Sequence, residues 1–217
     1  MRKFYQIAMD GPAGAGKSTI AKELANRLNF TFINSGGIFR SIAVAAVKNN
    51  IDPLNMTAIE NLLDNITITQ KGDDMHLNGE NISNLTWTPA ITAIVPHIAQ
   101  IKKVRKFVKE SQRRIAVEND IVIEGRDTTT IVFPEATLKC WIFASPETRA
   151  QRRWEQNGKS ESFESVLASV IQRDKFDSER VLAPMKRAID AFDVDTTHLS
   201  IAEACEKIIN EFNKRIK

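Results

Sequence analysis

The chain of 217 residues has little of what marks several specialised protein classes. It contains only two cysteines, Cys140 and Cys205, which are far apart and show no metal-ligand spacing, so a disulfide scaffold and a cysteine-held metal are excluded. No apolar run approaches the roughly 18 residues of a membrane span, and the one near the N-terminus is too short for a signal peptide. Because the formal charge is only +3, nothing indicates a nucleic-acid or membrane partner. We expect a cytoplasmic monomer in which Cys140 is a buried thiol.

The composition is that of a soluble globular protein, with 42% apolar and 26% charged residues, which excludes disorder and collagen. Five short apolar runs have the pattern of strands that are buried on both faces, at residues 4–9, 30–33, 121–123, 138–144 and 191–194. Helical patterns lie between most of these runs. The alternation predicts an α/β fold with a parallel sheet that helices cover on both sides.

Two helices are indicated by side-chain spacing. The apolar side chains of Ile20, Leu24 and Leu28 share one face of a helix that follows the first strand. The last helix opens with Ser200 and Glu203 as a capping box. Apolar residues then recur at helical spacing, and we expect this helix to bury Ile201, Cys205, Ile208, Phe212 and Ile216.

One region interrupts the alternation. Residues 66–70 and 75–77 flank a polar turn at 71–74, which predicts a hairpin. The hairpin lies between a helix near 41–48 and two helices that span about 90–118. The predicted organisation is therefore a core at 1–34 with a glycine-rich loop, an inserted module at 35–105, core again at 106–148, a lid and arginine-rich segment at 149–180, and a last core segment at 181–217.

The glycine-rich loop runs from Gly11 to Ser18 and fits the pattern Gly-x-x-x-x-Gly-Lys-Ser/Thr. Its glycines let backbone N–H groups turn toward phosphate oxygens, and the following helix directs its positive dipole end at them. In this pattern Lys17 reaches the outer phosphates and Ser18 supplies a hydroxyl to Mg²⁺. We expect a bound nucleoside triphosphate, contacted by Gly11, Pro12, Ala13, Gly14, Ala15, Gly16, Lys17, Ser18 and Thr19.

Proteins with such a loop include switches, motors and small-molecule kinases. A GTP switch would need Asn-Lys-x-Asp and Asp-x-x-Gly, and neither pattern occurs here. A transporter ATPase would carry Asp-Glu after the strand at 121–123, where this chain has Glu124 and Gly125. Seven of the fourteen arginines lie between residues 126 and 187, which favours a kinase, because arginine binds crowded phosphate oxygens bidentately. Arg149 and Arg153 share one helix face, although such a face can also be merely solvated.

Six motifs together resemble those of bacterial cytidylate kinase, within the nucleoside monophosphate kinases of the P-loop class. They occur in family order between residues 7 and 209, at 10–19, 34–40, 125–127, 131–134, 173–180 (with Ala183-Pro184) and 195–200. The resemblance implies a P-loop kinase fold with a five-stranded parallel sheet, a monophosphate-binding module and a short lid. It also implies transfer of the γ-phosphoryl group from Mg²⁺-bound ATP to CMP or dCMP.

The resemblance further implies roles for individual residues. Ser35, Arg40, Arg126 and Arg180 would hold the phosphate of CMP, while Arg105 and Asp127 would contact the cytosine edge. The sugar hydroxyls would be bound by Arg173 and Asp177. Lys17, Arg126, Arg149 and Arg153 would be the catalytic cations, with Arg152 beside them in the lid.

Simpler interpretations exist for several of these residues. Arg40 could be a surface residue, and Asp177 and Arg180 could form a local ion pair on a helix. Ser35 could cap the helix that follows it while also donating to phosphate.

The sequence departs from the family pattern in four places. Pro96 stands where a serine usually contacts the base, and Trp87 stands where an arginine is common. Glu124 replaces an aspartate, which affects how Mg²⁺ or its waters are held. Thr128 and Thr129 replace an apolar-Gly pair and stiffen their loop. Because Pro96 removes one hydroxyl for the base, a related kinase that prefers UMP stays open as an alternative. A weakly catalytic nucleotide-binding regulator is the other alternative.

Overall fold

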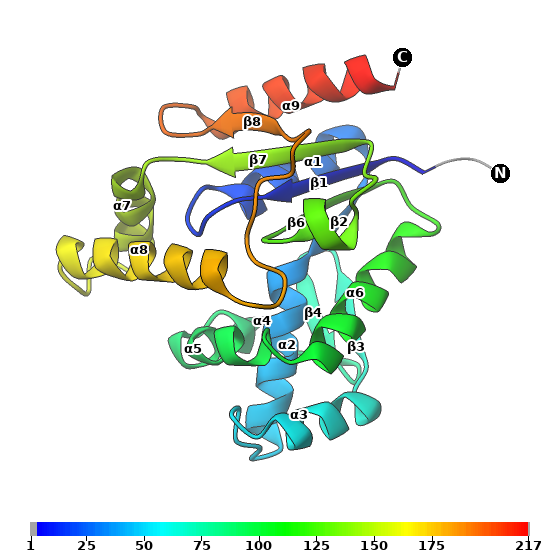
Figure 1. The fold of residues 1–217 in the computed structure, drawn as a ribbon, viewed down its shortest axis with the longest axis vertical. Helices are drawn as coiled ribbons and strands as arrows, with labels where there is room; N and C mark the ends of the chain where they lie inside the picture. The colour runs from blue at the N-terminus through cyan, green and yellow to red at the C-terminus, as the bar shows by residue number, and fades with distance from the viewer. Residues whose placement is uncertain (1–3, 217) are drawn as a thin grey trace. The chain divides into compact units, whose positions relative to one another are not determined.

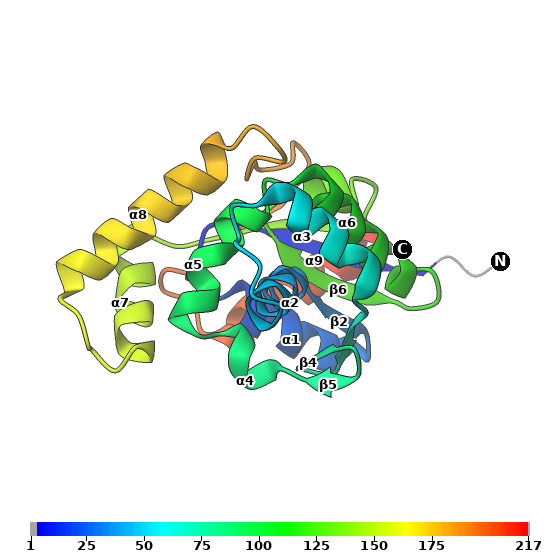
Figure 2. The same ribbon diagram turned by 90° about the horizontal axis from the view of Figure 1, so that it is seen from below.

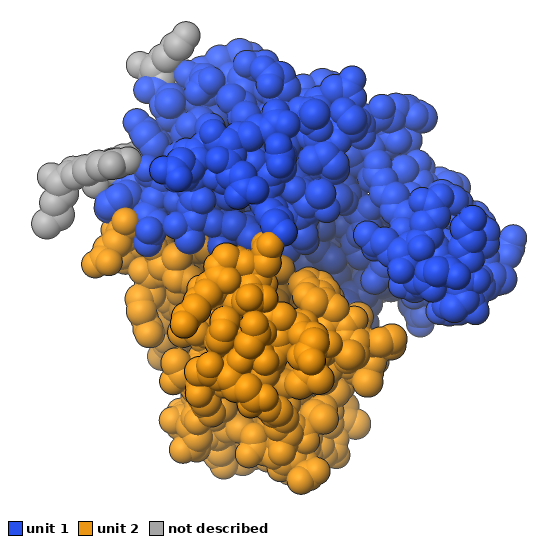
Figure 3. Space-filling model, turned by 180° about the vertical axis from the view of Figure 1, so that it is seen from behind, with its two compact units in different colours: residues 1–32, 119–217 blue, residues 33–118 orange. Residues whose placement is uncertain are grey.

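The computed structural model describes residues 4–216, which fall into two compact units (Figure 3). Unit 1 contains the described residues up to Phe32 and those from Asn119 onward, and unit 2 contains Ile33–Glu118. Within 4–216, no helix has both the length and the apolar character that a bilayer crossing requires. The predicted bounds of the inserted module (35–105) and of the lid and arginine-rich segment (149–180) stay predictions.

A five-stranded sheet forms the framework of unit 1, in the order β2-β6-β1-β7-β8 (Figure 1). Its strands are β1 (Gln6–Asp10), β2 (Thr31–Asn34), β6 (Ile121–Gly125), β7 (Leu138–Phe143) and β8 (Phe192–Asp195). Strand β1 pairs in parallel with β6 and β7, and β7 pairs in parallel with β8. The predicted α/β fold with its five strands is confirmed to within two residues at each strand end. Because parallel strands end at the same edge, the segments after β1, β6 and β7 meet there.

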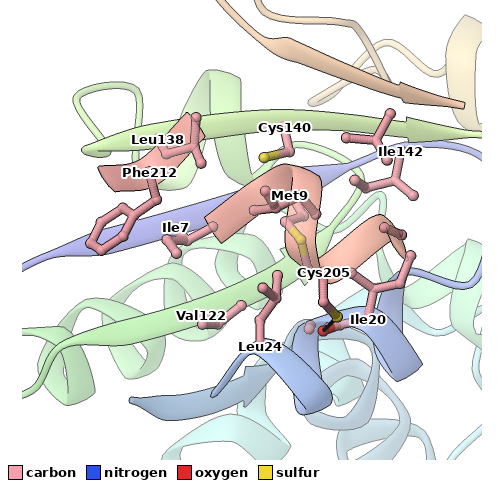
Figure 4. Close-up of a cluster of buried hydrophobic side chains, with 14 of the residues drawn as sticks. Ile7, Met9, Ile20, Leu24, Val122, Leu138, Cys140, Ile142, Cys205 and Phe212 are labelled. Atoms are coloured by element: carbon pink, nitrogen blue, oxygen red, sulfur yellow. Dashed lines mark hydrogen bonds between the residues drawn. The ribbon is translucent and has the colours of Figure 1, made fainter. Parts of the chain in front are cut away.

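Helices α1 (Lys17–Leu28) and α9 (Ile201–Arg215) pack against the sheet and enclose a buried apolar core (Figure 4). Alternate residues of β1 and β7 point into it, including Ile7, Met9 and Cys140, so the prediction of a buried Cys140 thiol is confirmed. The capping box of Ser200 and Glu203 is present at the start of α9.

Two predictions for this last helix are wrong. Ile201 and Ile216 were expected to be buried but are 36% and 38% exposed. They occupy the two ends of α9, and the core is closed by residues in between, namely Ala204, Cys205, Ile208 and Phe212. The helical period correctly identified the buried face but not where along the helix the contact with the sheet ends.

Helices α7 (Pro146–Gln156) and α8 (Phe163–Glu179) lie side by side in unit 1 (Figures 1 and 2). They bury a small cluster of their own around Ala150, Val166 and Val170, with Trp154 edge-on to Phe163. After β6, the chain makes one turn of π-helix, η2 (Thr128–Val132).

Unit 2 is built around α2 (Ser35–Lys48), which packs against α5 (Pro89–Ile98), α6 (Lys102–Ala116) and a three-stranded antiparallel sheet. The predicted hairpin is confirmed as β3 (Ile68–Lys71) and β4 (Asp74–Leu77), with Gly72 in the turn at φ +60°. The sequence analysis did not anticipate α3 (Met56–Leu62), η1 (Leu63–Asn65), β5 (Glu80–Asn81) or α4 (Ser83–Thr86). Helix α2 begins at Ser35, well before the expected 41.

Candidate functional site

The loop between β1 and α1 has the tight geometry of a phosphate cradle. Gly11 has a φ of +148°, and a Cβ there would overlap the carbonyl oxygen of Ile142 on β7. Gly14 has a φ of +79°, and its Cβ would lie 3.1 Å from both Cβ and the carbonyl oxygen of Arg149. Only glycine fits two such positions, because the backbone is left-handed and its neighbours are close. A tight, glycine-dependent backbone directly before a helix start is the kind that presents N–H groups to a phosphate.

Lys17, the first residue of α1, is buried and folds back over the loop. Its Nζ donates a hydrogen bond to the carbonyl of Pro12 at 2.6 Å. Burial and the nearby positive charge of Arg126 lower the pKa of Lys17 to about 7, although the carboxylates of Glu124 and Asp10 oppose the shift. Among the described residues 4–216, the ammonium forms no ion pair with these carboxylates, and a bound phosphate would supply a direct anionic partner.

Next to Lys17, the hydroxyl of Ser18 donates to Oε1 of Glu124 at 3.0 Å. Glu124 lies near the end of β6 and is buried. A hydroxyl and a carboxylate are hard oxygen ligands of the kind that Mg²⁺ prefers. The described residues 4–216 contain no group of three or more His, Cys, Asp or Glu that could hold a metal alone. This donor set therefore fits a Mg²⁺ that takes its other ligands from phosphates and water.

An ion pair between the neighbouring helices α7 and α8 clamps the phosphate loop at Ala13. Arg149 Nη1 donates to Asp174 Oδ2 at 2.6 Å and to the carbonyl of Ala13 at 3.0 Å. Asp174 Oδ1 accepts the N–H of Ala13 at 3.3 Å, and Arg149 Nε donates to the carbonyl of Ala144. The buried guanidinium of Arg149 thus ties together the segments that follow β1 and β7.

Asp177 on α8 is the centre of an arginine cluster. Only 1% of its surface is exposed. Its Oδ2 accepts from Nε of Arg126 at 3.0 Å and from Nε of Arg173 at 3.1 Å, and Nη1 of Arg180 lies 3.7 Å from Oδ1. Burial alone would raise the pKa of Asp177, but the three arginines together hold it below its ordinary value. The predicted ion pair with Arg180 is present, yet it is one part of this larger group.

One oxygen of this carboxylate is not fully used. Asp177 Oδ1 is buried and accepts no hydrogen bond. Buried polar atoms without a partner are uncommon, and a ligand hydroxyl is one way to satisfy them. Arg180 also reaches Asp127, with Nη2 at 3.3 Å from Oδ1.

Arg153 completes the cluster and differs from its neighbours. Within residues 4–216 it makes no hydrogen bond or ion pair with another side chain or carbonyl. Its pKa is lowered by burial and by the positive charges of Arg173 and Arg126. Arg152, in contrast, donates to the carbonyl of Thr196 at 2.6 Å. The guanidinium of Arg153 is therefore available to bind an anion, whereas Arg152 fastens α7 to the segment after β8.

In unit 2, the start of α2 carries two of the predicted residues. Asn34, not Ser35, caps the helix, since its side chain accepts from the N–H of Gly37 at 2.9 Å, so the interpretation of Ser35 as the cap is wrong. The hydroxyl of Ser35 is buried and has no hydrogen-bond partner. Arg40 is half-buried, donates to the carbonyl of Gly36 at 3.2 Å, and stacks on Trp87 with 4.2 Å between its Cζ and the ring centre.

Arg105 on α6 is held beside the same helix. Its Nε donates to the carbonyl of Ala99 at 2.6 Å, and its guanidinium lies 5.6 Å from the ring centre of Phe39. Pro96 lies within α5 and offers no hydroxyl or N–H.

The structure thus brings the predicted residues together in two sets. Unit 1 contains the phosphate loop with Lys17 and Ser18, and the cluster of Arg126, Asp127, Arg149, Arg153, Arg173, Asp177 and Arg180. Unit 2 contains Ser35, Arg40 and Arg105. The sequence analysis missed Asp174 and Thr196. The position of Asp174 within the 173–180 motif was the only feature of the sequence that could have indicated a role in the site.

Comparisons with known proteins agree with this geometry. A family model described as cytidylate kinase matches residues 7–214. The cytidylate kinase of Alkaliphilus oremlandii is 41% identical over 96% of this chain and 97% of its own length, and that of Halalkalibacterium halodurans is 37% identical over 99% and 100%. Among solved structures, protein TT1252 from Thermus thermophilus (TM-score 0.52, 17% identity, 100% of both chains) and a shikimate kinase from Bacteroides thetaiotaomicron (TM-score 0.50, 12% identity, 96% and 98%) share the fold. The chain belongs to the cytidylate kinase family.

Proposed function

We propose that this protein transfers the γ-phosphoryl group of ATP to CMP or dCMP, giving ADP and CDP or dCDP. The observation that carries the proposal is the surplus of positive charge in unit 1, beside the phosphate loop. Lys17 and Arg153 both have pKa values lowered by burial and by neighbouring cations. Two cations that lack anions, next to a phosphate cradle, fit a reaction in which two phosphorylated substrates meet.

On the ATP side, the loop N–H groups and Lys17 bind the outer phosphates. Ser18 and Glu124 would hold Mg²⁺, which neutralises charge on the β- and γ-phosphates when it is bound. Arg149 and Asp174 keep the loop in its cradle shape through Ala13.

On the acceptor side, the free oxygen Oδ1 of Asp177 suits a sugar hydroxyl, with Arg173 beside it. In unit 1, Arg126 and Arg180 would be ligands of the CMP phosphate. In unit 2, the buried hydroxyl of Ser35 and the stacked guanidinium of Arg40 keep the phosphate-binding roles that the family resemblance implies. Arg105 and Asp127 would contact the cytosine edge.

The chemistry follows from these charges. The phosphate of CMP is a dianion at neutral pH, so its oxygen attacks the γ-phosphorus in line and needs no general base. Negative charge shifts toward the leaving oxygen and the equatorial oxygens during transfer. Lys17, Arg126 and Arg153 stabilise that charge, and Arg153 is the most available of them because no other residue of the described part of the chain forms a hydrogen bond or ion pair with it.

A UMP preference is favoured by one observation, the absence of a donor side chain at Pro96. A lost hydrogen bond to the base costs about 0.5–1.5 kcal/mol, which blurs the selection of cytosine over uracil without abolishing transfer.

The test is ADP release from Mg²⁺-ATP with CMP, dCMP, UMP, AMP and GMP in parallel, with Lys17→Met as the inactive control. We expect turnover with CMP and dCMP that exceeds the other three, and loss of turnover in the control. A preference for UMP would keep the kinase and overturn the roles of Arg105 and Asp127. Absence of turnover with every acceptor would favour a nucleotide-binding regulator.

A further inference from the structure

A buried carboxylate stands at the end of β1, directly before the phosphate loop. Asp10 has no exposed surface. Such a charge is costly unless several donors surround it. Asp10 has four, because Oδ1 accepts from N and Oγ1 of Thr128 at 2.9 and 2.8 Å, and Oδ2 accepts from N and Oγ1 of Thr129 at 2.7 and 2.6 Å. Each oxygen therefore receives one backbone N–H and one hydroxyl.

These donors lie immediately after two residues of the proposed acceptor site. Thr128 opens the π-turn η2, and Arg126 and Asp127 precede it. This π-helical turn also fixes the backbone of Asp127, whose carbonyl accepts hydrogen bonds from the N–H groups of Ile131 and Val132 at 2.9 and 3.2 Å. The segment after β6 is thus fastened to the end of β1 through one carboxylate, and both attachment points belong to unit 1.

The two threonine hydroxyls supply half of this attachment. Burial raises the pKa of Asp10, and the hydrogen bonds from Thr129 and Thr128 oppose that rise. With backbone donors alone, the carboxylate would keep two hydrogen bonds, and the segment would be held only through its main chain. The apolar-Gly pair that the family resemblance implies at these positions would keep the two backbone donors but would offer no hydroxyl.

We propose that Thr128 and Thr129 are positioning residues, whose hydroxyls hold the Arg126–Asp127 segment against Asp10 and set its side chains for the acceptor nucleotide. The effect on catalysis rests on the proposed function. The fastening itself rests on the geometry alone and can be tested without any substrate.

The third threonine of the run provides a matched control. The hydroxyl of Thr130 is buried and has no hydrogen-bond partner. Thr130→Val makes the same change of shape and polarity in the same turn without removing a hydrogen bond to Asp10. The double exchange to serine at 128 and 129 keeps both hydroxyls and removes only methyl groups.

The first measurement is hydrogen exchange of the peptide that covers residues 126–133 in the ligand-free protein. We expect T128V/T129V to exchange about tenfold faster than wild type, since two charge-assisted hydrogen bonds are lost. T128S/T129S and T130V should stay at the wild-type rate. Equal rates in T128V/T129V and T130V would overturn the fastening.

The second measurement separates positioning from a general loss of structure. We expect T128V/T129V to raise the KM for CMP about tenfold or more, to change the KM for ATP less than about twofold, and to be rescued by the serine variant. Matched losses for both substrates would overturn a positioning role. CMP binding is also measured by calorimetry. A wild type that binds CMP without turnover would overturn the proposed function, and the CMP affinities of the variants would then test the positioning role. A wild type that does not bind CMP would overturn the proposed function, and the exchange rates of the ligand-free variants would still decide whether the hydroxyls fasten the segment.

Discussion

Replacing Lys17 by methionine should remove activity and at the same time stabilise the ligand-free protein. The pKa of Lys17 falls from its ordinary 10.5 to about 7 because of burial and of nearby Arg126. That difference corresponds to about 5 kcal/mol when the amine is charged in the folded protein. Methionine has no charge to bury, but it leaves the carbonyl of Pro12 without its 2.6 Å donor, which costs about 1 kcal/mol. The expected net gain below pH 7 is about 4 kcal/mol.

The gain must also depend on pH in a defined direction. Between pH 7 and 10.5 the unfolded chain holds the proton of Lys17 and the folded chain does not, so the wild type becomes more stable as the pH rises through this window. Lys17→Met lacks this dependence. Its advantage should be largest at pH 6, should fall to about zero near pH 10, and should become a deficit of about 1 kcal/mol at higher pH, where only the lost hydrogen bond to Pro12 remains.

Urea denaturation of both proteins at pH 6, 8 and 10, followed by circular dichroism, measures the difference directly. Because only the difference is compared, other groups that titrate in this range cancel. Lys175→Met on α8, at an exposed site, controls for the loss of a lysine. A stability difference between wild type and Lys17→Met that stays constant from pH 6 to 10 would refute the burial of the ammonium on which this reasoning depends.

Two further predictions concern the contacts around the site. Asp174→Asn removes the charge that pairs with Arg149 and weakens the hold on Ala13, so the KM for ATP should rise about three- to tenfold in steady-state assays; unchanged ATP kinetics would count against the clamp. Trp87, which is 53% exposed, stacks on Arg40; Trp87→Leu should weaken CMP binding about two- to fivefold by calorimetry, whereas Trp87→Phe should keep most of the affinity. Equal losses in the leucine and phenylalanine variants would contradict a role for the ring face.

Local features of the sequence carried most of the correct predictions. The phosphate loop is defined by eight consecutive residues, although the residues that leave no room for a Cβ at Gly11 and Gly14, namely Ile142 and Arg149, are distant in the sequence. The five core strands are short apolar runs, and a strand buried on both faces has few alternatives. The capping box of α9 likewise depends only on Ser200 and Glu203.

The start of α2 shows where local reasoning falls short. The expected helix near 41–48 leaves out the run Ser35-Gly36-Gly37, whose helix propensity is low. The side chain of Asn34 caps the helix before this run, and a Cβ at Gly37 would lie 2.9 Å from Sδ of Met75. The cap is a local contact that the sequence contains, whereas the close packing of Gly37 against Met75 joins residues far apart along the chain.

The contacts that the sequence could not predict join residues more than a hundred positions apart. Asp10 and Thr128 are separated by 118 positions, and Ala13 and Asp174 by 161. The sequence around Asp10 does not indicate which residues donate hydrogen bonds to its carboxylate. Three threonines in a row likewise do not reveal that two of them bind a carboxylate and the third does not. Such pairs follow from the strand order, which sequence patterns leave open.

In the ligand-free protein, most of the buried cations of unit 1 are already paired with carboxylates. Asp177 pairs with Arg126, Arg173 and Arg180, and Asp174 with Arg149, so most cations have a carboxylate within reach. Among the described residues, Lys17 and Arg153 form no ion pair with a carboxylate, and burial lowers the pKa of both. The folded protein therefore pays for two desolvated cations that only an anion from outside can balance. Nucleotide binding should return that free energy as both affinity and stability, because a ligand that binds only the folded state stabilises it by RT ln(1 + [L]/Kd), where [L] is the concentration of free ligand.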